Sequence, residues 1–245
     1  MIVRVPDYFS EFSCIAGDCK DSCCLGWEID IDEDSYEYYQ TLPGEVGERL
    51  RKGMYETEDG GHGIRTNNCG RCIMLNDKNL CDLYIAAGEA SLSEVCTDFP
   101  RFGIEYRNVE QKCLSLACEE VCRIFFSKTQ PVKFVEQELF GDSDDDQGVT
   151  EEEAAFFEEV QREQLLVYFT FRYIMNAIYD SNIMVYAYLS VMFTMIVRDM
   201  NATRFYKNGG SFTIEDQMEV ARIFSKEVEH SEENVEAAKE EIIWG

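Results

Sequence analysis

Eleven cysteines lie between Cys14 and Cys122, and the chain has none after that point. Thiols used for ordinary packing would show no such boundary, so their confinement to one half of the chain predicts a local site. Zinc ions and iron–sulfur clusters can both be bound by four thiolates in a tetrahedral arrangement. The spacing of the cysteines along the sequence does not distinguish well between the two. The plausible ligands exceed the needs of one four-coordinate centre. The sequence therefore predicts either two sites or one site with spare thiols.

The thiols are expected to be reduced. Eleven cysteines in 245 residues is a lower density than that of small disulfide frameworks, and the number is odd. The first residues, MIVRVPDYFS, contain no basic segment followed by an apolar run, so no signal peptide is expected. A cytoplasmic, reducing location is therefore predicted, where thiols bind metal more often than they form disulfides. Disulfides and plain buried thiols are the alternatives.

The charge of the chain limits its partners. There are 48 acidic and 22 basic residues, which gives a formal net charge of −26. Such a surface repels phosphate backbones and anionic membranes and attracts cationic partners. We therefore expect no nucleic acid and no membrane as partners. Solubility alone is the other explanation of the acidity.

Other kinds of site are less well supported. The aspartates of 30–34 and 142–146 resemble the start of calcium loops, but Ser35 and Gln147 stand where such loops need glycine. The sequence has no G-x-G-x-x-G loop and no P-loop. His62, in a glycine-rich stretch, is expected to be exposed rather than a ligand or a proton carrier.

The elements of the amino-terminal half must bring the thiols together. Alternation of apolar and polar residues predicts a strand over 27–32 and hairpins over 71–84 and 102–116. The first hairpin would place Cys72 and Cys81 on one ladder. The helices predicted in this half are two short surface helices within 34–58 that break at Pro43-Gly44, one over 86–96 and one over 119–126.

The carboxyl-terminal half is predicted to be helical. The acidic, glycine-flanked stretch 141–149 has the composition of a linker, and Thr150 with Glu153 forms a capping-box pair. We predict an α+β fold, mostly α, with a cysteine-rich domain over 1–140, the linker, and a helical domain over 150–245. Its predicted helices cover 150–179, an uncharged and centrally buried segment 183–197, 214–229 after a cap at Thr213, and 232–243 after a cap at Ser231.

Several short motifs occur together in the amino-terminal half. They are Phe12-Ser13-Cys14, Cys19, Asp21 to Trp27, Cys72-Ile73-Met74-Leu75, Cys81, Gly88, Leu92-Ser93, Cys96 with Phe99-Pro100-Arg101, and Leu114 to Cys118. In order and spacing, residues 8–126 resemble the bacterial flagellin lysine-N-methylase family. More loosely, they resemble small cysteine-cluster proteins described as zinc- or iron-chelating.

This resemblance implies methyl transfer from S-adenosylmethionine to lysine side chains of flagellin. It also implies an iron–sulfur cluster of the 4Fe–4S type, with zinc as the alternative metal. The family-like thiols are Cys14, Cys19, Cys23, Cys24, Cys72, Cys81, Cys96 and Cys118. Cys69, Cys113 and Cys122 look like additions, and Glu119 replaces the proline that usually follows the last family cysteine.

Methyl transfer to lysine requires a neutral amine, so the site must desolvate the amine or supply a base. Glu28, Asp30, Asp98 and Tyr106 are near the thiols in sequence and are candidates for handling the substrate. Solvated acids on a strand face are the alternative interpretation. A non-catalytic zinc or iron–sulfur module with a helical interaction domain, or an electron carrier, are the alternative functions.

Overall fold

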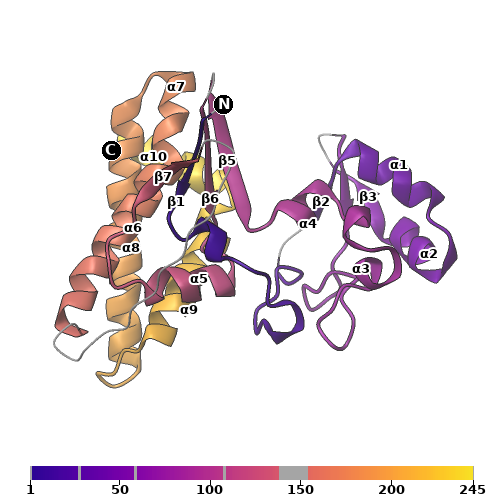
Figure 1. The fold of residues 1–245 in the computed structure, drawn as a ribbon, viewed down its shortest axis with the longest axis horizontal. Helices are drawn as coiled ribbons and strands as arrows, with labels where there is room; N and C mark the ends of the chain where they lie inside the picture. Colours follow the sequence, from indigo (N-terminus) through magenta and orange to yellow (C-terminus); the bar gives the residue numbers. More distant parts are fainter. Residues whose placement is uncertain (1, 27–28, 58–59, 107–108, 138–153, 245) are drawn as a thin grey trace. The chain divides into compact units, whose positions relative to one another are not determined.

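The computed structural model describes residues 2–26, 29–57, 60–106, 109–137 and 154–244, and contacts divide the chain into two compact units (Figure 1). The thiol unit consists of Ser13–Pro100 and Cys118–Glu120. The helical unit consists of the residues up to Phe12, Arg101–Ala117 and those from Val121 on. The predicted α+β class, mostly helical, is confirmed. The predicted linker and the capping pair lie outside the described residues.

A four-stranded sheet of order β5-β6-β1-β7 forms one layer of the helical unit (Figure 1). β5 (Arg101–Tyr106) and β6 (Val109–Leu114) are antiparallel, which confirms the predicted hairpin. Its predicted turn at 107–108 lies outside the described residues. β1 (Ile2–Pro6) joins β6 in parallel, and β7 (Phe134–Gln137) joins β1 antiparallel. Neither of these two strands was predicted.

Helix α6 (Ala154–Tyr173) packs on this sheet. The ring of Phe171 stacks on Phe134 of β7 with centres 4.1 Å apart, and the Phe171 carbonyl accepts a hydrogen bond from the Gln111 side chain of β6. The two contacts of Phe171 fix the sheet against the helical layer. The short 3-10 helix η1 (Phe9–Glu11) follows β1, and α5 (Glu119–Ser127) confirms the helix predicted after Cys118.

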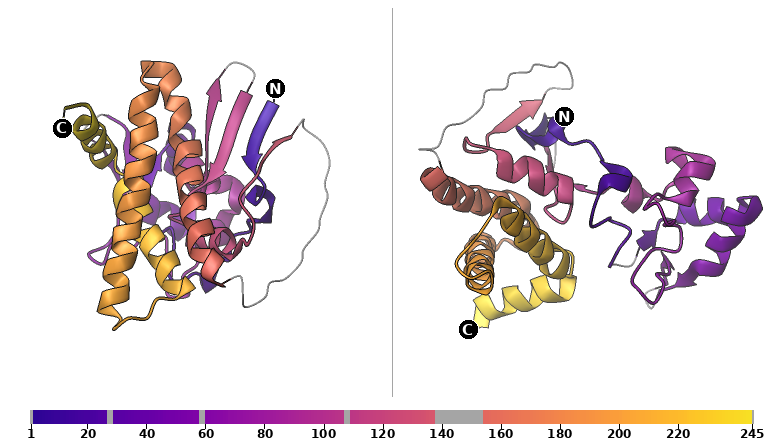
Figure 2. Two further views of the ribbon diagram at one scale, coloured as in Figure 1. Left: turned by 90° about the vertical axis from the view of Figure 1, so that its left-hand side faces the viewer. Right: turned by 90° about the horizontal axis from the view of Figure 1, so that it is seen from below.

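The helical layer is centred on three aromatic rings. α8 (Ile183–Lys207) runs beside α6, as the side and bottom views show (Figure 2), and α9 (Ile214–Phe224) packs against α8. Phe169, Phe193 and Phe224 meet edge to face with centres 5.2 to 5.6 Å apart. Edge-to-face packing adds to the free energy gained from burying the rings. This cluster is the core of the helical unit.

Two helices predicted here differ in the structure. The helix predicted to Tyr179 becomes a 3-10 turn at Ile174–Asn176, followed by the short α7 (Ala177–Asp180). α8 continues to Lys207 because residues 198–207 contain no glycine or proline.

The prediction that α8 is a centrally buried helix was wrong. Val185, Leu189 and Phe193 are buried, but residues spaced along another face are exposed: Met184, Tyr188, Val191 and Met195. By length and composition alone α8 could cross a membrane, a criterion that core helices of soluble proteins also meet. The helix thus has one buried face, and the residues named on its exposed face are apolar as well.

Both predicted caps near the carboxyl end are confirmed. Thr213 and Asp216 form a capping box at α9, and the Ser231 hydroxyl accepts the Asn234 N–H over 3.3 Å at α10 (Glu232–Trp244). α9 ends at Phe224 and the chain continues as a π-helical turn, Ser225–Glu229, instead of an α-helix to residue 229.

The thiol unit contains a small antiparallel sheet of order β2-β4-β3. The strands are β2 (Ile29–Ile31), β3 (Met54–Glu56) and β4 (His62–Ile64). α1 (Glu33–Thr41) and α2 (Gly44–Gly53) confirm the predicted break at Pro43-Gly44. Instead of lying in an exposed loop, His62 begins β4 and stacks on the Tyr36 ring with centres 3.5 Å apart.

Two local predictions in this unit need correction. The chain folds back within 71–84 through one isolated bridge, Leu75 with Cys81, instead of two paired strands. Cys72 forms its bridge with Thr66, so Cys72 and Cys81 do not share a ladder as predicted. The helix predicted over 86–96 is divided because Gly88 adopts a φ of 82°, which ends α3 (Asp82–Ala87). A 3-10 turn, Glu89–Ser91, and α4 (Glu94–Asp98) follow.

Candidate metal centre

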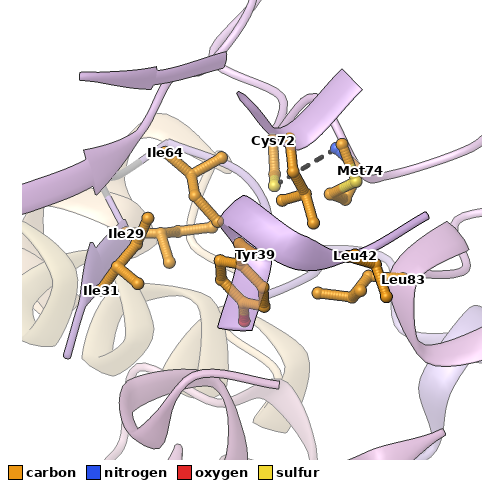
Figure 3. Close-up of a cluster of buried hydrophobic side chains, with 9 residues drawn as sticks. Ile29, Ile31, Tyr39, Leu42, Ile64, Cys72, Met74 and Leu83 are labelled. Carbon is orange, nitrogen blue, oxygen red and sulfur yellow. Dashed lines mark hydrogen bonds between the residues drawn. The ribbon is translucent and has the colours of Figure 1, made fainter. Parts of the chain in front are cut away.

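The centre of the thiol unit is a cluster of buried side chains, called the core cluster below (Figure 3). The sheet contributes isoleucines through its alternating pattern, and α1 and α2 each contribute one apolar face. Its members are Ile29, Ile31, Tyr39, Leu42, Leu50, Ile64, Cys72, Met74 and Leu83. Figure 3 shows Cys72 beside Met74, whose N–H donates to the Cys72 sulfur over 3.5 Å.

Four of the eight predicted ligands meet at this cluster. Cys72 is a member with 5% of its surface exposed, and Cys24, Cys81 and Cys96 pack against the cluster while half-buried. The Cys72 N–H donates to the Cys24 carbonyl oxygen over 2.8 Å. The loop from Cys72 returns through the Leu75–Cys81 bridge, so residues distant in sequence are held side by side.

These buried thiols oppose one another's ionisation. Burial, and to a smaller extent the Cys24, Cys96 and Cys81 thiols, raise the pKa of Cys72 to about 12. Burial likewise raises the pKa of Cys96 to about 11, and Cys24 and Cys81 contribute in the same direction. Burial also raises the pKa of Cys81. Both causes disfavour the thiolate, and both are offset when a cation binds.

Three further thiols lie near the 3-10 turn η2 (Ala16–Asp18). The Cys14 sulfur accepts the Ala16 N–H over 3.4 Å, and the Cys19 N–H donates to the Ala16 carbonyl over 3.2 Å. Burial raises the pKa of Cys19 to about 12, followed by the charges of Glu119, Cys118 and Cys14. Cys14, Cys19 and Cys118 therefore lie within electrostatic reach of one another, although about 100 residues separate Cys19 from Cys118.

Glu119 joins these distant segments. Its Oε2 accepts the N–H of Lys20 over 2.7 Å and that of Asp21 over 3.1 Å, and it lies 3.5 Å from the Cys19 sulfur. A carboxylate that accepts several backbone N–H bonds holds a loop firmly. In the sequence, Glu119 stands out only because it replaces the proline that usually follows the last family cysteine. No local pattern in the sequence indicates this contact.

Adjacent Cys23 and Cys24 form a hydrogen-bonded pair. The Cys23 thiol donates to the Cys24 sulfur, which lowers the pKa of Cys24 to about 7 and raises that of Cys23. Burial opposes the shift at Cys24, whereas Ser22 and Arg71 support it. Cys24 is thus the thiol of this pair that ionises first, and the thiolate is the form that binds metal.

The three cysteines regarded as additions are placed differently. Cys69 is exposed in a loop of the thiol unit. Cys113 and Cys122 are buried in the helical unit, where the Cys113 sulfur lies 3.8 Å from the Tyr8 hydroxyl and the Cys122 thiol donates to the Leu116 carbonyl over 2.9 Å. All eight predicted ligands, including Cys118, belong to the thiol unit. The buried pair packs as small apolar side chains do.

The donor set can be compared with what an iron–sulfur cluster or zinc requires. In the described part of the chain, no three His, Cys, Asp or Glu side chains are placed so that they could hold a metal ion. The donors nevertheless fit in type, because thiolates are the soft ligands that zinc and iron–sulfur clusters select. They also fit in environment, because a cation offsets the burial and mutual repulsion that raise their pKa values.

The structure describes the side chains of two of the four candidates for substrate handling. Asp30 in β2 and Asp98 at the end of α4 are exposed, while Glu28 and the side chain of Tyr106 lie outside the described residues. Instead, Asp32 has a structural contact. Its carboxylate accepts the Ser35 N–H at the start of α1 over 2.9 Å and the Glu94 N–H at the start of α4 over 2.8 Å.

A second group of polar side chains is buried in the helical unit and was not predicted. The Arg172 guanidinium lies 3.0 Å from Glu229 Oε1, and the Tyr168 and Tyr173 hydroxyls donate to the same carboxylate over 3.3 and 3.5 Å. Arg172 also lies 3.9 Å from the centre of the Phe102 ring. Burial raises the pKa of Glu229, which Arg172 and the tyrosines oppose. Arg172, a charged residue within the apolar run of α6, is the sequence feature that could have indicated this buried group.

Comparisons with known proteins relate the chain to lysine N-methylases. Residues 147–243 match the family of the FliB lysine N-methylase C-terminal domain. A lysine-N-methylase of Salmonella typhimurium strain LT2 is 31% identical over 127 residues, which is 49% of this chain and 31% of that protein. The flagellar biosynthetic protein FliU of Salmonella muenchen is also 31% identical over 127 residues, and the match covers 73% of it.

The chain thus spans about a third of the length of the lysine-N-methylases that it matches, at 31% of the Salmonella typhimurium protein. The lysine-N-methylase of Salmonella choleraesuis strain SC-B67 gives the same figures, 31% identity over 127 residues and 31% of its length. No solved structure matches the chain.

Proposed function

The chain belongs to the lysine-N-methylase family, and on this premise we propose that it acts in the transfer of a methyl group to lysine side chains of flagellin. S-adenosylmethionine would supply the methyl group, and a metal centre, an iron–sulfur cluster or zinc, would be held by the eight family-like thiols. The observation that carries the proposal is their collection in one compact unit, with Cys113 and Cys122 left in the other.

The charge of the chain is consistent with a lysine-bearing substrate. A net charge of −26 attracts cationic side chains over distances of about one Debye length, roughly 8 Å at physiological salt. The same acidity opposes loss of the ammonium proton, and only the neutral amine can attack a methyl carbon. The reacting amine must therefore be bound away from the acidic surface, in surroundings that desolvate it.

Cys24 and the loop 67–81 would position the metal centre. Cys24 has a pKa of about 7, so near neutral pH it is a ready thiolate ligand. Arg71, whose guanidinium donates to the Asn76 carbonyl and to Asn79 Oδ1 over 3.1 Å each, supports the negative charge on Cys24. The loop 67–81 is thereby tied to the site that it helps to build.

The test is a methylation assay with protein purified under anaerobic conditions and loaded with metal. Incubation with flagellin and S-adenosylmethionine should add methyl groups to flagellin lysines, as detected by peptide mass spectrometry. Cys24→Ser should abolish the modification, and Cys69→Ser, at an exposed thiol outside the eight, should keep it. Unmodified flagellin after incubation with metal-replete wild-type protein would contradict the proposal.

A non-catalytic metal-binding module is the second candidate function. It is favoured by the position of Cys24, Cys72, Cys81 and Cys96 on the core cluster, where a bound metal would stabilise the fold itself. This role predicts that the metal protects the thiol unit against unfolding while flagellin stays unmodified.

A further inference from the structure

Helix α8 exposes an apolar surface to solvent, called the α8 stripe below. It consists of Met184, Tyr188, Val191 and Met195, each between 46% and 57% exposed. Their spacing of i, i+4, i+7 and i+11 puts them on one face of the helix. Soluble proteins rarely leave a large contiguous apolar surface uncovered, and such surfaces mark interaction sites. The α8 stripe therefore has the character of a docking surface.

The dimensions of the stripe suit a helix as its partner. At a rise of 1.5 Å per residue the stripe is about 17 Å long, or three turns, and Tyr206, which is 78% exposed, continues the same face. Next to Met195, the side chains of Ile196 and Met200 line a hollow of about 760 Å³ between α8 and α9. An amphipathic helix binds a surface of this kind with side chains spaced i, i+3, i+4 and i+7.

The charges around the stripe decide which helix fits. Residues 183–197 carry no charge, and in the next turn Arg198 and Asp199 pair with one another over 2.8 Å. α10 packs against α8 (Figure 2), and the Lys239 ammonium lies 5.3 Å from the centre of the Tyr186 ring, so α10 lies beside the uncharged half of α8.

The helix α10 is strongly acidic. Packed helices lie about 8–10 Å apart, which is roughly one Debye length at physiological salt, so charges on α10 act on a partner bound to α8. Apart from Lys239, all charged side chains of α10 are acidic and exposed: Glu232, Glu233, Glu236, Glu240 and Glu241. The surroundings of the stripe therefore favour a partner with cationic side chains.

We propose that the α8 stripe docks an amphipathic helix of the protein substrate, whose apolar residues lie against the stripe and whose lysine or arginine residues lie beside α10. The inference rests on the proposed function for the identity of the partner as the substrate. A second copy of the chain fits the stripe less well, because two chains of net charge −26 repel each other. Lysines that pair with α10 stay charged, so the stripe holds the substrate while the amine that reacts lies elsewhere.

The test measures how tightly the full chain binds two synthetic peptides, without metal or methyl donor. Each is roughly 20 residues long, because shorter isolated helices are marginal in water. Both have leucine at i, i+4, i+7 and i+11, with lysine at the flanking positions of one and glutamate at those of the other. The wild type should bind the lysine peptide about tenfold more tightly, and added salt should reduce the difference. Equal affinities, or no binding of the lysine peptide, would overturn the proposal.

Matched double variants locate the binding surface. Tyr188→Gln/Met195→Gln replaces two apolar contacts and should weaken binding of the lysine peptide about tenfold. Tyr84→Gln/Ile85→Gln replaces two similarly exposed side chains of the thiol unit and should bind as the wild type does. Circular dichroism compares the folding of the variants. Unchanged affinity in the folded stripe variant would place the peptide elsewhere and overturn the proposal.

A second pair of variants tests the charges. Glu233→Gln/Glu240→Gln should weaken binding of the lysine peptide about threefold and reduce its dependence on salt. Glu45→Gln/Glu48→Gln removes the same charge from exposed positions of α2 and should have a smaller effect. Equal effects of the two variants would contradict a role of α10.

The remaining measurements test other occupants of the stripe. A wild-type dimer in sedimentation that Tyr188→Gln/Met195→Gln turns into a monomer would assign the stripe to a second copy of the chain. Binding to neutral phosphatidylcholine vesicles that the same variant loses would assign it to a membrane surface. Either result would overturn the proposal. Since no flagellin, metal or methyl donor is present, failure of docking and failure of methylation are separate outcomes.

Discussion

The two units handle buried polar groups in opposite ways. In the helical unit, the Glu229 side chain is fully buried, but Arg172, Tyr168 and Tyr173 all bind its carboxylate. In the thiol unit, burial and neighbouring thiols raise the pKa of Cys72, Cys96 and Cys19. The buried carboxylate is compensated by partners within the protein, whereas the grouped thiols stay protonated and neutral unless a cation offsets the cost of ionising them. The helical unit thus compensates its buried carboxylate with its own side chains, although Arg172 Nη1 has no hydrogen-bond partner in the described part of the chain, whereas for the thiol unit we propose that a metal does so.

The strongest test of this contrast is Glu229→Ala. The substitution leaves the Arg172 guanidinium buried without its carboxylate, so the free energy of unfolding should fall by about 3–5 kcal/mol. The matched control is Glu236→Ala, which removes a mostly exposed carboxylate 2.8 Å from Lys239 and should cost less than about 1 kcal/mol. Denaturant unfolding followed by circular dichroism measures both. Similar small losses in the two variants would show that the helical unit does not depend on its buried pair.

Zinc binding should stabilise one unit only. At a free concentration about a hundred times the dissociation constant, a ligand of the folded state adds about 2.7 kcal/mol to the free energy of unfolding. The added protection should lie in 13–100, where nearly all of the proposed ligands are, and should be lost in Cys14→Ser/Cys81→Ser. Amide hydrogen exchange with peptide resolution gives the measurement. Zinc-dependent protection of α6 and α8 without protection of the thiol unit would reverse the contrast.

A smaller effect is expected from Asp32→Ala. Asp32 caps α1 and also accepts the Glu94 N–H, and these bonds lower the pKa of its carboxyl. Loss of such a cap costs about 0.5–2 kcal/mol, and α4, which carries Cys96, would be held less firmly. Asp30→Ala is the control, because Asp30 is exposed two residues earlier. The measurements are denaturant unfolding and zinc affinity. Equal results for the two variants would exclude a positioning role for Asp32.

Much of the fold could be predicted because its signals are local. The break at Pro43-Gly44, the hairpin 102–116 and the caps Thr213 and Ser231 depend on residues within one turn or one ladder. By contrast, the parallel pairing of β1 with β6 joins residues over a hundred positions apart. The exposed face of α8 was also missed, because an uncharged run does not reveal how many neighbours will cover it.

The candidate site shows the same limit. The sequence suggests candidate thiols, but it cannot show that Cys24 packs against the core cluster while the adjacent Cys23 is exposed. Nor does it show that Glu119 reaches Lys20 and Asp21. Glu229 is one of many glutamates near the carboxyl end, and only the fold distinguishes it by placing Arg172 beside it. Long-range packing decides each of these contacts.

The smallest predicted effect is a pH dependence that belongs to the helical unit. Burial, with the charges of Arg172 and Lys226, lowers the pKa of His230 from 6.5 to about 4, and its Nε2 lies 2.8 Å from the Ser115 hydroxyl. Between these pH values the unfolded chain binds more protons than the folded one, so stability is complete above pH 6.5 and falls as the pH is lowered toward 4. The ring is partly exposed, so solvent screening limits the change in the free energy of unfolding to about 1 kcal/mol or less.

Denaturant unfolding between pH 7 and 5, roughly the range in which histidine titrates, should show this fall in stability in the wild type and a smaller one in His230→Gln. Equal falls in the two proteins would mean that the surroundings of His230 do not oppose its protonation. The helical unit would then accept a positive charge at His230 in addition to that of Arg172, which pairs with Glu229.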